Sequence, residues 1–270
     1  WQVFRPQDQF GSAGRIFQIA QALLEGNAYL AFVGLVPIIF VILIFLVVVF
    51  AEGMHVNIPI AMGQTGAGAR FPVKLLYVSN MPVILAAALF ANFQLWSSLT
   101  KGIPILGGII GGISWATQAP RSGGGLSLVE GLLTLGITST TLNEVLQALV
   151  YIIVLVVACV IFGRFWIELG GQGSKAVAAQ LDNSGMSIPG FRRDPRIMQK
   201  VLDRYIPPVT IMGSIFVGLL AGLSDITTAS LVSGTGVLLT VGIVYRLYEE
   251  LAKAQLMDLH PALKTFFGEK

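Results

Sequence analysis

Charged side chains are scarce in this chain. Asp, Glu, Lys and Arg together make up 11% of its 270 residues, whereas a soluble domain carries about 25%. Hydrophobic residues make up 54% of the sequence, and the mean hydropathy is +0.78. This balance argues against a soluble globular domain and favours a protein that has the lipid bilayer as its solvent.

Cysteine and histidine are nearly absent as well. The single cysteine, Cys159, excludes an internal disulfide. His55 and His260 stand alone, and the sequence holds no H-E-x-x-H or G-x-S-x-G motif and no metal-spaced Cys/His cluster. The sequence therefore predicts no catalytic residue, no metal site and no cofactor, and we expect a protein that is not an enzyme.

Long uncharged runs are the main feature that the sequence does contain. Asp, Glu, Lys and Arg are missing from five stretches, which cover residues 28–51, 75–100, 145–163, 205–224 and 226–245. A helix needs about 20 apolar residues to cross a hydrocarbon core, and backbone groups in lipid must pair within the segment. We therefore predict an all-α membrane protein with five transmembrane helices, over about 28–51, 76–98, 145–167, 205–224 and 228–250.

The basic residues lie mostly on one side of these spans. If each span reverses the direction of the chain, 13 of the 17 Lys and Arg residues fall on one side and 4 on the other. The side with more Lys and Arg faces the cytoplasm in most membrane proteins. We expect a multi-pass protein of the plasma membrane with its N-terminus outside and its C-terminus in the cytoplasm.

The segments between the spans divide the rest of the chain. Residues 1–27 form an outer segment, and residues 28–270 form the membrane domain. Helical spacing over 12–25 predicts an amphipathic helix that lies on the outer surface or packs on a neighbouring domain. The remaining segments are cytoplasmic loops 52–75 and 168–204, an outer glycine-rich loop 99–144 and a cytoplasmic tail 251–270. The first of these loops is predicted to be a hairpin with a basic tip. Because the sequence begins at Trp1, we expect it to be a piece of a longer protein.

Small and polar residues in the spans suggest how the helices pack and what they do. Gly218 and Gly222 form a G-x-x-x-G pair that would let another helix approach closely. Ser79 or Asn80 is expected to cap the second span. The span centres hold no ionisable residue, and ion-coupled carriers normally keep charges there. Coupled transport is therefore disfavoured, although a secondary transporter module built on inverted repeats and an integral membrane lipid enzyme stay open as alternatives.

Three motifs point to a known family. The sequence YVSNMPVILAAALFAN at 77–92 resembles the seventh membrane helix of archaeal-type SecY, the channel subunit of the Sec protein translocon. RYIPP at 204–208 resembles the start of its ninth helix, and GTGVLLTV at 234–241, followed by YR at 245–246 and YE at 248–249, resembles its tenth. The resemblance covers nearly the whole chain and implies the C-terminal half, helices six to ten, of an inverted-repeat ten-helix channel.

The resemblance also implies a pore and a gate. It places Met81, Ile84 and Leu239 in a ring of apolar side chains that seals the pore against ions yet tolerates a passing polypeptide. It places Asn92 in the lateral gate, where a polar side chain would hold the closed state by hydrogen bonds. The implied function is a passive, gated channel that translocates secretory proteins and inserts membrane proteins.

The expected partners follow from the same resemblance. Arg70, Lys74, Arg192 and Arg193 would dock the ribosome, because Arg binds RNA phosphates in bidentate fashion; charges that only set topology are the plainer explanation. The other partners implied are the N-terminal half of SecY, SecE/gamma-type and small beta-type or SecG-type subunits, a cytoplasmic motor, signal sequences and nascent polypeptides.

Overall fold

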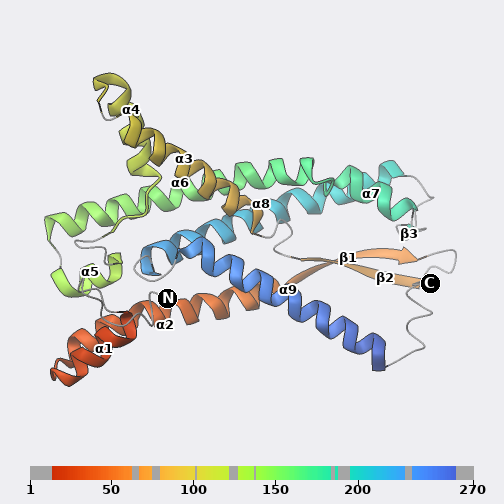
Figure 1. Cartoon of the computed structure of the whole chain (residues 1–270). Coiled ribbons are helices and arrows are strands. Elements are labelled where there is room, and N and C mark those ends of the chain that lie inside the picture. Colours follow the sequence, from red (N-terminus) through yellow and green to blue (C-terminus); the bar gives the residue numbers. More distant parts are fainter. Residues whose placement is uncertain are drawn as a thin grey trace.

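A computed structural model describes nine segments of the chain, which are residues 14–62, 67–74, 80–100, 102–121, 127–136, 138–183, 186–187, 195–228 and 233–259. Five long helices dominate these segments (Figure 1), and they are α2 (Ala28–Glu52), α3 (Met81–Leu99), α6 (Ser139–Leu169), α8 (Pro195–Thr228) and α9 (Gly234–Leu259). The shorter elements are α1 (Arg15–Leu24), α4 (Pro104–Ala116), α5 (Leu128–Leu135), α7 (Ser174–Asn183), β1 (His55–Met62), β2 (Ala67–Lys74) and β3 (Met186–Ser187).

Four of the described helical segments are long and apolar enough to cross a membrane. They are Ala28–Glu52, Met81–Leu99, Thr140–Asn183 (which joins α6 to α7) and Arg196–Thr228. The predicted class, a helical membrane protein, is confirmed. Five spans were predicted, and among the described residues only these four helical segments qualify as spans. Helix α9 falls short because its second half carries Arg246, Glu249 and Glu250. It packs against α2 and α8, so a fifth span stays a prediction.

One core joins the five long helices. In lipid, helices associate through close van der Waals packing, because the surrounding acyl chains are as apolar as the side chains themselves. Each long helix contributes buried side chains to a single cluster, among them Val48 of α2, Val83 of α3, Leu155 of α6, Val217 of α8 and Leu238 of α9. This shared core fixes α3 and α9 relative to each other.

The predicted G-x-x-x-G contact is confirmed between α8 and α6. A methyl group added at Gly218 would lie 3.2 Å from the Cβ and Sγ atoms of Cys159, and one added at Gly222 would lie 3.1 Å from Cγ1 of Ile152. One added at Gly163 of α6 would overlap the hydroxyl of Ser214. Small residues along both helices therefore let the two backbones pack closely.

A small antiparallel sheet, which the all-α prediction omitted, forms outside the helices at the end of the bundle that holds α7 (Figure 1). Strands β1 and β2 form the expected hairpin, with His55 opposite Lys74 and Met62 opposite Ala67. Strand β3 pairs with the other edge of β1, so that Ala61 lies opposite Ser187. The two segments predicted to be cytoplasmic loops are therefore joined in one sheet.

The predicted N-terminal amphipathic helix is present as α1, and it packs against α2. Its Arg15 forms a fork with the fully buried Glu130 of α5, at 3.1 Å from Nη1 to Oε1 and 3.2 Å from Nη2 to Oε2. Glu130 also completes a capping box with Ser127 at the start of α5. Helix α1 therefore packs on α2 and α5 of the same chain, and its place on the outer surface stays a prediction.

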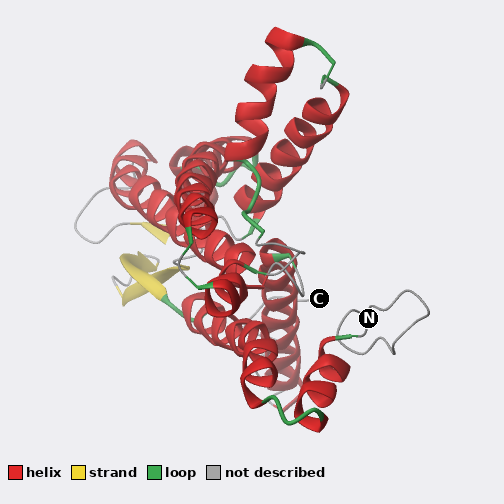
Figure 2. Cartoon of the chain, turned by 90° about the vertical axis from the view of Figure 1, so that its left-hand side faces the viewer, coloured by secondary structure: helices red, strands yellow, loops and turns green. Residues whose placement is uncertain are grey.

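The predicted outer segment 99–144 contains two helices. Glycines of α4, including Gly108, Gly111 and Gly112, have no atom within 4 Å of an added Cβ position. The end of α3 and α4 project together beyond the rest of the bundle (Figure 2). Helix α5 instead lies near α1 and α2 (Figure 1). Neither helix reaches the length of a span.

Candidate pore-lining site

The first turn of α3 forms one wall of the candidate site. Asn80 occupies the N-cap position and Pro82 lies in the first turn, where a missing N–H is tolerated. The expected side-chain cap by Asn80 is not formed, and Ser79 lies outside the described residues. Nδ2 of Asn80 instead donates a hydrogen bond to the Leu238 carbonyl of α9, at 2.9 Å. This bond ties the start of α3 to the second turn of α9.

Helix α9 forms the opposite wall, and its start is fixed against α8 and α6. The carboxylate of Asp225 accepts hydrogen bonds from the Gly234 N–H at 2.6 Å and from the Tyr151 hydroxyl at 2.7 Å. A methyl group at Gly234 would lie 2.7 Å from the Ala221 carbonyl oxygen. The absence of a side chain at Gly234 therefore lets α9 begin directly on the backbone of α8.

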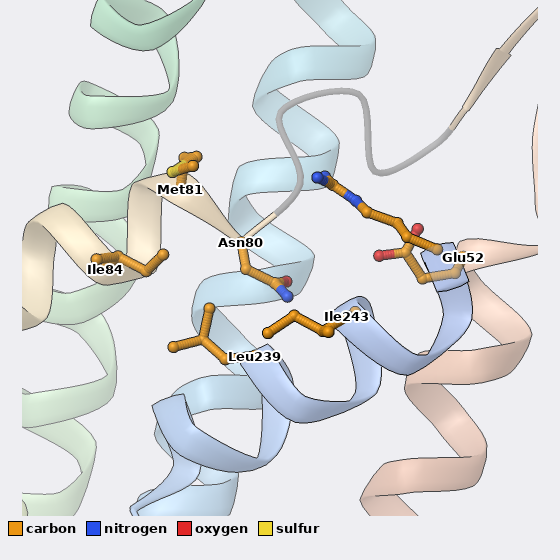
Figure 3. A pocket seen from close by; sticks show the side chains of 8 residues that line it. Glu52, Asn80, Met81, Ile84, Leu239 and Ile243 are labelled. Atoms are coloured by element: carbon orange, nitrogen blue, oxygen red, sulfur yellow. The ribbon is translucent and has the colours of Figure 1, made fainter. Parts of the chain in front are cut away.

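These two walls enclose a cavity of about 230 Å³. Its lining contains all three residues predicted for the pore ring, and comprises Glu52, Asn80, Met81, Ile84, Leu239, Gly242, Ile243 and Arg246. Figure 3 shows Met81 and Ile84 on the first turns of α3 beside Leu239 on α9. The structure therefore brings the predicted ring residues together, although 155 positions separate Ile84 from Leu239 (239 − 84).

Apart from the exposed Arg246, the cavity is lined by apolar side chains on its exposed side and by buried polar groups behind them. Met81 is 37% exposed and Ile243 is 65% exposed, whereas Asn80 is 8% exposed and Glu52 is 4% exposed. The apolar side chains therefore line the face that this chain leaves uncovered. The buried polar groups hold the walls together behind that face.

Several lining residues were not predicted from the sequence. Ile243 follows Leu239 by one helical turn, so helical spacing was a signal that could have found it. Gly242 follows Leu239 by three residues, so the same spacing places it on that face. The contribution of Glu52 depends on a helix that is distant in sequence, and no local pattern indicates it. Asn80 was predicted as a helix cap, but its hydrogen bond to the Leu238 carbonyl was not predicted.

Asn92, the predicted gate residue, lies away from this cavity. It is exposed, and its Nδ2 donates to the Ala88 carbonyl of its own helix at 2.9 Å. It follows Ile84 by two helical turns, which corresponds to about 12 Å along the axis. The structure therefore separates Asn92 from the ring residues while leaving its side chain accessible on the surface of α3.

The predicted docking residues are placed only at the level of the backbone. Arg70 pairs with Pro59 and Lys74 pairs with His55 across the β1–β2 ladder. Arg192 and Arg193 lie outside the described residues. Among the residues that the structure describes, no group of three or more His, Cys, Asp or Glu side chains is arranged to hold a metal ion.

Apolar spans packed in a bundle, with apolar side chains of two long helices lining one cavity, define the class of multi-pass helical membrane proteins. The SecY family profile matches residues 7–248. The chain therefore belongs to the SecY family.

Curated relatives agree with this membership. The protein translocase subunits SecY of Methanococcus vannielii and Methanocaldococcus jannaschii are each 43% identical to the chain, over 97% and 96% of its length. The chain spans 58% and 57% of the lengths of these two proteins.

Solved structures give the same result for the fold. One is the structure of a protein-conducting channel, and another comes from work on the plug domain of the SecY protein. Each superposes on 92% of this chain with a TM-score of 0.70 at 41% identity. The chain covers 55% and 56% of those two chains, respectively. The yeast Ssh1 complex bound to the 80S ribosome contains a chain that shares the fold, with a TM-score of 0.53 at 16% identity.

Proposed function

We propose that this chain is the C-terminal half of a protein-conducting channel, which translocates secretory proteins across the membrane and inserts membrane proteins into it. The convergence of Met81, Ile84 and Leu239 on one cavity is the observation that carries the proposal. The relatives named as protein translocase subunits, at 43% identity, support it. Because the chain spans just over half of those relatives, it supplies one wall of the pore, and an N-terminal half supplies the other.

The mechanism that fits this wall is passive. A constriction formed by the apolar side chains of Met81, Ile84 and Leu239 resists the entry of ions, because these three side chains offer no polar group to an ion that loses its water there. The same side chains form no strong specific bond with a passing polypeptide, so the constriction accepts many sequences. Met81 adds a flexible thioether that adapts to chains of different bulk. Direction and energy come from partners outside the pore.

The lateral exit is assigned to the accessible face of α3 around Asn92. Its amide is accessible on a membrane helix, where a polar group gains by bonding to another helix. In the closed channel, a polar group of the N-terminal half takes that position. A signal sequence that enters between the two halves replaces this contact with its own apolar surface.

Partners bind on the cytoplasmic side, which is assigned from the excess of Lys and Arg there. The sheet that joins β1, β2 and β3 supports this assignment, since it holds both basic loops in one unit. Arg70, Lys74, Arg192 and Arg193, which belong to these two loops in the sequence, are the residues expected to bind RNA phosphates. The ribosome-bound Ssh1 complex, which shares the fold, supports a ribosome as the partner. SecE-type and small beta-type or SecG-type subunits complete the complex.

Ion conductance tests the proposal. In the full channel that contains this chain, Ile84→Gly combined with Leu239→Gly removes two side chains of the seal and is expected to raise the resting ion leak. Leu149→Gly combined with Ile153→Gly, on the exposed face of α6, is the control and is expected to leave the leak low. A leak that stays at the parent level in the ring variant would exclude the assigned ring.

A further inference from the structure

The hydrogen bond between Asn80 and Leu238 joins the two walls of the pore-lining cavity. Asn80 is more than nine-tenths buried, and its Nδ2 lies 2.9 Å from the Leu238 carbonyl oxygen. The two residues are 158 positions apart. Within the described residues, Oδ1 of Asn80 has no hydrogen-bond partner, so the bond to α9 is made through the donor end of the amide.

Gly242 provides the space in which this amide sits. A methyl group at Gly242 would lie 2.6 Å from Nδ2 of Asn80 and 3.9 Å from Oε1 of Glu52. Separations under 3.0 Å essentially never occur for real Cβ atoms, so a side chain at position 242 would displace the Asn80 amide from the position in which it binds the Leu238 carbonyl. Helices α2, α3 and α9 thus meet at one glycine, one turn beyond the carbonyl that Asn80 binds.

Both ends of the bond adjoin residues of the predicted ring. The Asn80 carbonyl accepts the Ile84 N–H at 3.2 Å, and Asn80 precedes Met81 directly. Leu238 precedes Leu239, which lines the cavity. In Figure 3 the Asn80 side chain points from the start of α3 toward α9, between Leu239 and Ile243. A shift at this bond would therefore move Ile84 and Leu239 relative to each other.

We propose that Asn80 and Gly242 are positioning residues of the pore ring: the Asn80 amide, seated over Gly242, sets the spacing between the first turn of α3 and α9. The inference rests on the proposed channel function, since it concerns the same ring. It assigns no contact between either residue and a translocating chain. Its claim is that ring geometry depends on one buried donor and on the absence of a side chain at position 242.

Cross-linking within the full channel tests this claim directly. The chain has one cysteine, the buried Cys159, so a Cys159→Ala background carrying Ile84→Cys and Leu239→Cys reports on the ring pair alone. Bismaleimides of increasing length measure the separation of the two thiols. The parent is expected to react with the shortest reagent, because both residues line one cavity of about 230 Å³.

The variants separate a positioning role from general destabilisation. Asn80→Ala and Gly242→Ala are each expected to lower the yield with the shortest reagent about threefold or more, as the loss of one interhelical bond in a membrane protein predicts. Yield with longer reagents should be retained. The double variant should behave like Asn80→Ala alone, since the added methyl group then has no amide to displace. Thr240→Val, which removes a hydroxyl bonded within α9, is the control and should match the parent.

The outcomes are distinct. Unchanged yield in both single variants overturns the inference, and so does a double variant that is worse than either single one. Loss of yield with every reagent, together with loss of helical circular dichroism, also counts against it, because the residues would then support the fold as a whole. Conductance is scored separately: a ring variant without a leak excludes the assigned ring, on which the proposed channel function rests, whereas the cross-linking pattern decides the positioning role.

Discussion

Replacing Gly218 by valine tests the packing of α6 against α8, on which the pore wall rests. A Cβ atom at this position would lie 3.2 Å from Cβ and Sγ of Cys159 and 3.2 Å from Cα of Val156. The last of these atoms belongs to the backbone and cannot turn away. Alanine therefore requires a shift of a few tenths of an ångström, and valine adds two further methyl groups beyond that Cβ.

The expected magnitude follows from two opposing effects. Overpacking of a close interface costs about 1–3 kcal/mol. Valine has a better helix propensity than glycine, which returns about 0.4 kcal/mol. The net loss in the free energy of unfolding is therefore about 0.6–2.6 kcal/mol. The matched control is Gly112→Val in α4, where nothing lies within 4 Å of the added Cβ, and a change within about 0.5 kcal/mol is expected there.

The assay is unfolding of the full channel by SDS in mixed micelles, followed by far-ultraviolet circular dichroism. A rescue variant sharpens the assay. Cys159→Gly removes two of the three atoms that oppose the new side chain and leaves only Cα of Val156, so Gly218→Ala should be tolerated better in that background than in the parent. If Gly218→Val is no more destabilising than Gly112→Val, the close α6–α8 packing described for this chain is wrong.

Two further perturbations address the edges of the molecule. Arg15→Ala removes the cation from the buried Glu130 and is expected to destabilise the α1–α5 contact by about 2 kcal/mol, which faster hydrogen exchange in α1 would reveal. Glu25→Ala, at an exposed position of the same segment, is the control. Equal exchange rates in the two variants would contradict a role for the ion pair. Replacement of Arg192 and Arg193 by glutamate is expected to weaken ribosome binding at low salt and to make its salt dependence shallower, because fewer phosphates are contacted. The control is Arg121→Glu, at a residue assigned to the outer side, and this variant should bind the ribosome like the parent. Ribosome binding that is unchanged in the double variant would remove Arg192 and Arg193 from the docking surface.

The membrane helices could be predicted from the sequence because lipid imposes a local rule. Uncharged runs of sufficient length must be helical wherever they cross the bilayer, and α2 follows its run within one residue at its end, at Glu52 against a predicted 51. Helix α9 shows the limit of that rule. Its uncharged first half continues into a charged second half without a break, so hydropathy alone does not define its length as a span.

Contacts between distant segments were beyond the reach of local patterns. The Asn80–Leu238 bond uses a backbone carbonyl, which every residue possesses, so sequence gives no sign of which one is bound. The pairing of β3 with β1 joins two loops that each looked independent. The ring residues were placed by resemblance to a family, and packing then explains why they meet: one core holds α3 and α9 together.

The most direct test of the account is to locate a polypeptide stalled halfway through the full channel. With a cysteine at the middle of the stalled chain and a Cys159→Ala background, disulfide adducts are expected at Ile84→Cys and Leu239→Cys. They should be absent at Leu149→Cys, on the exposed face of α6. Adducts at position 149 with none at positions 84 and 239 would show that the chain passes elsewhere and that the apolar cavity of α3 and α9 is not the pore.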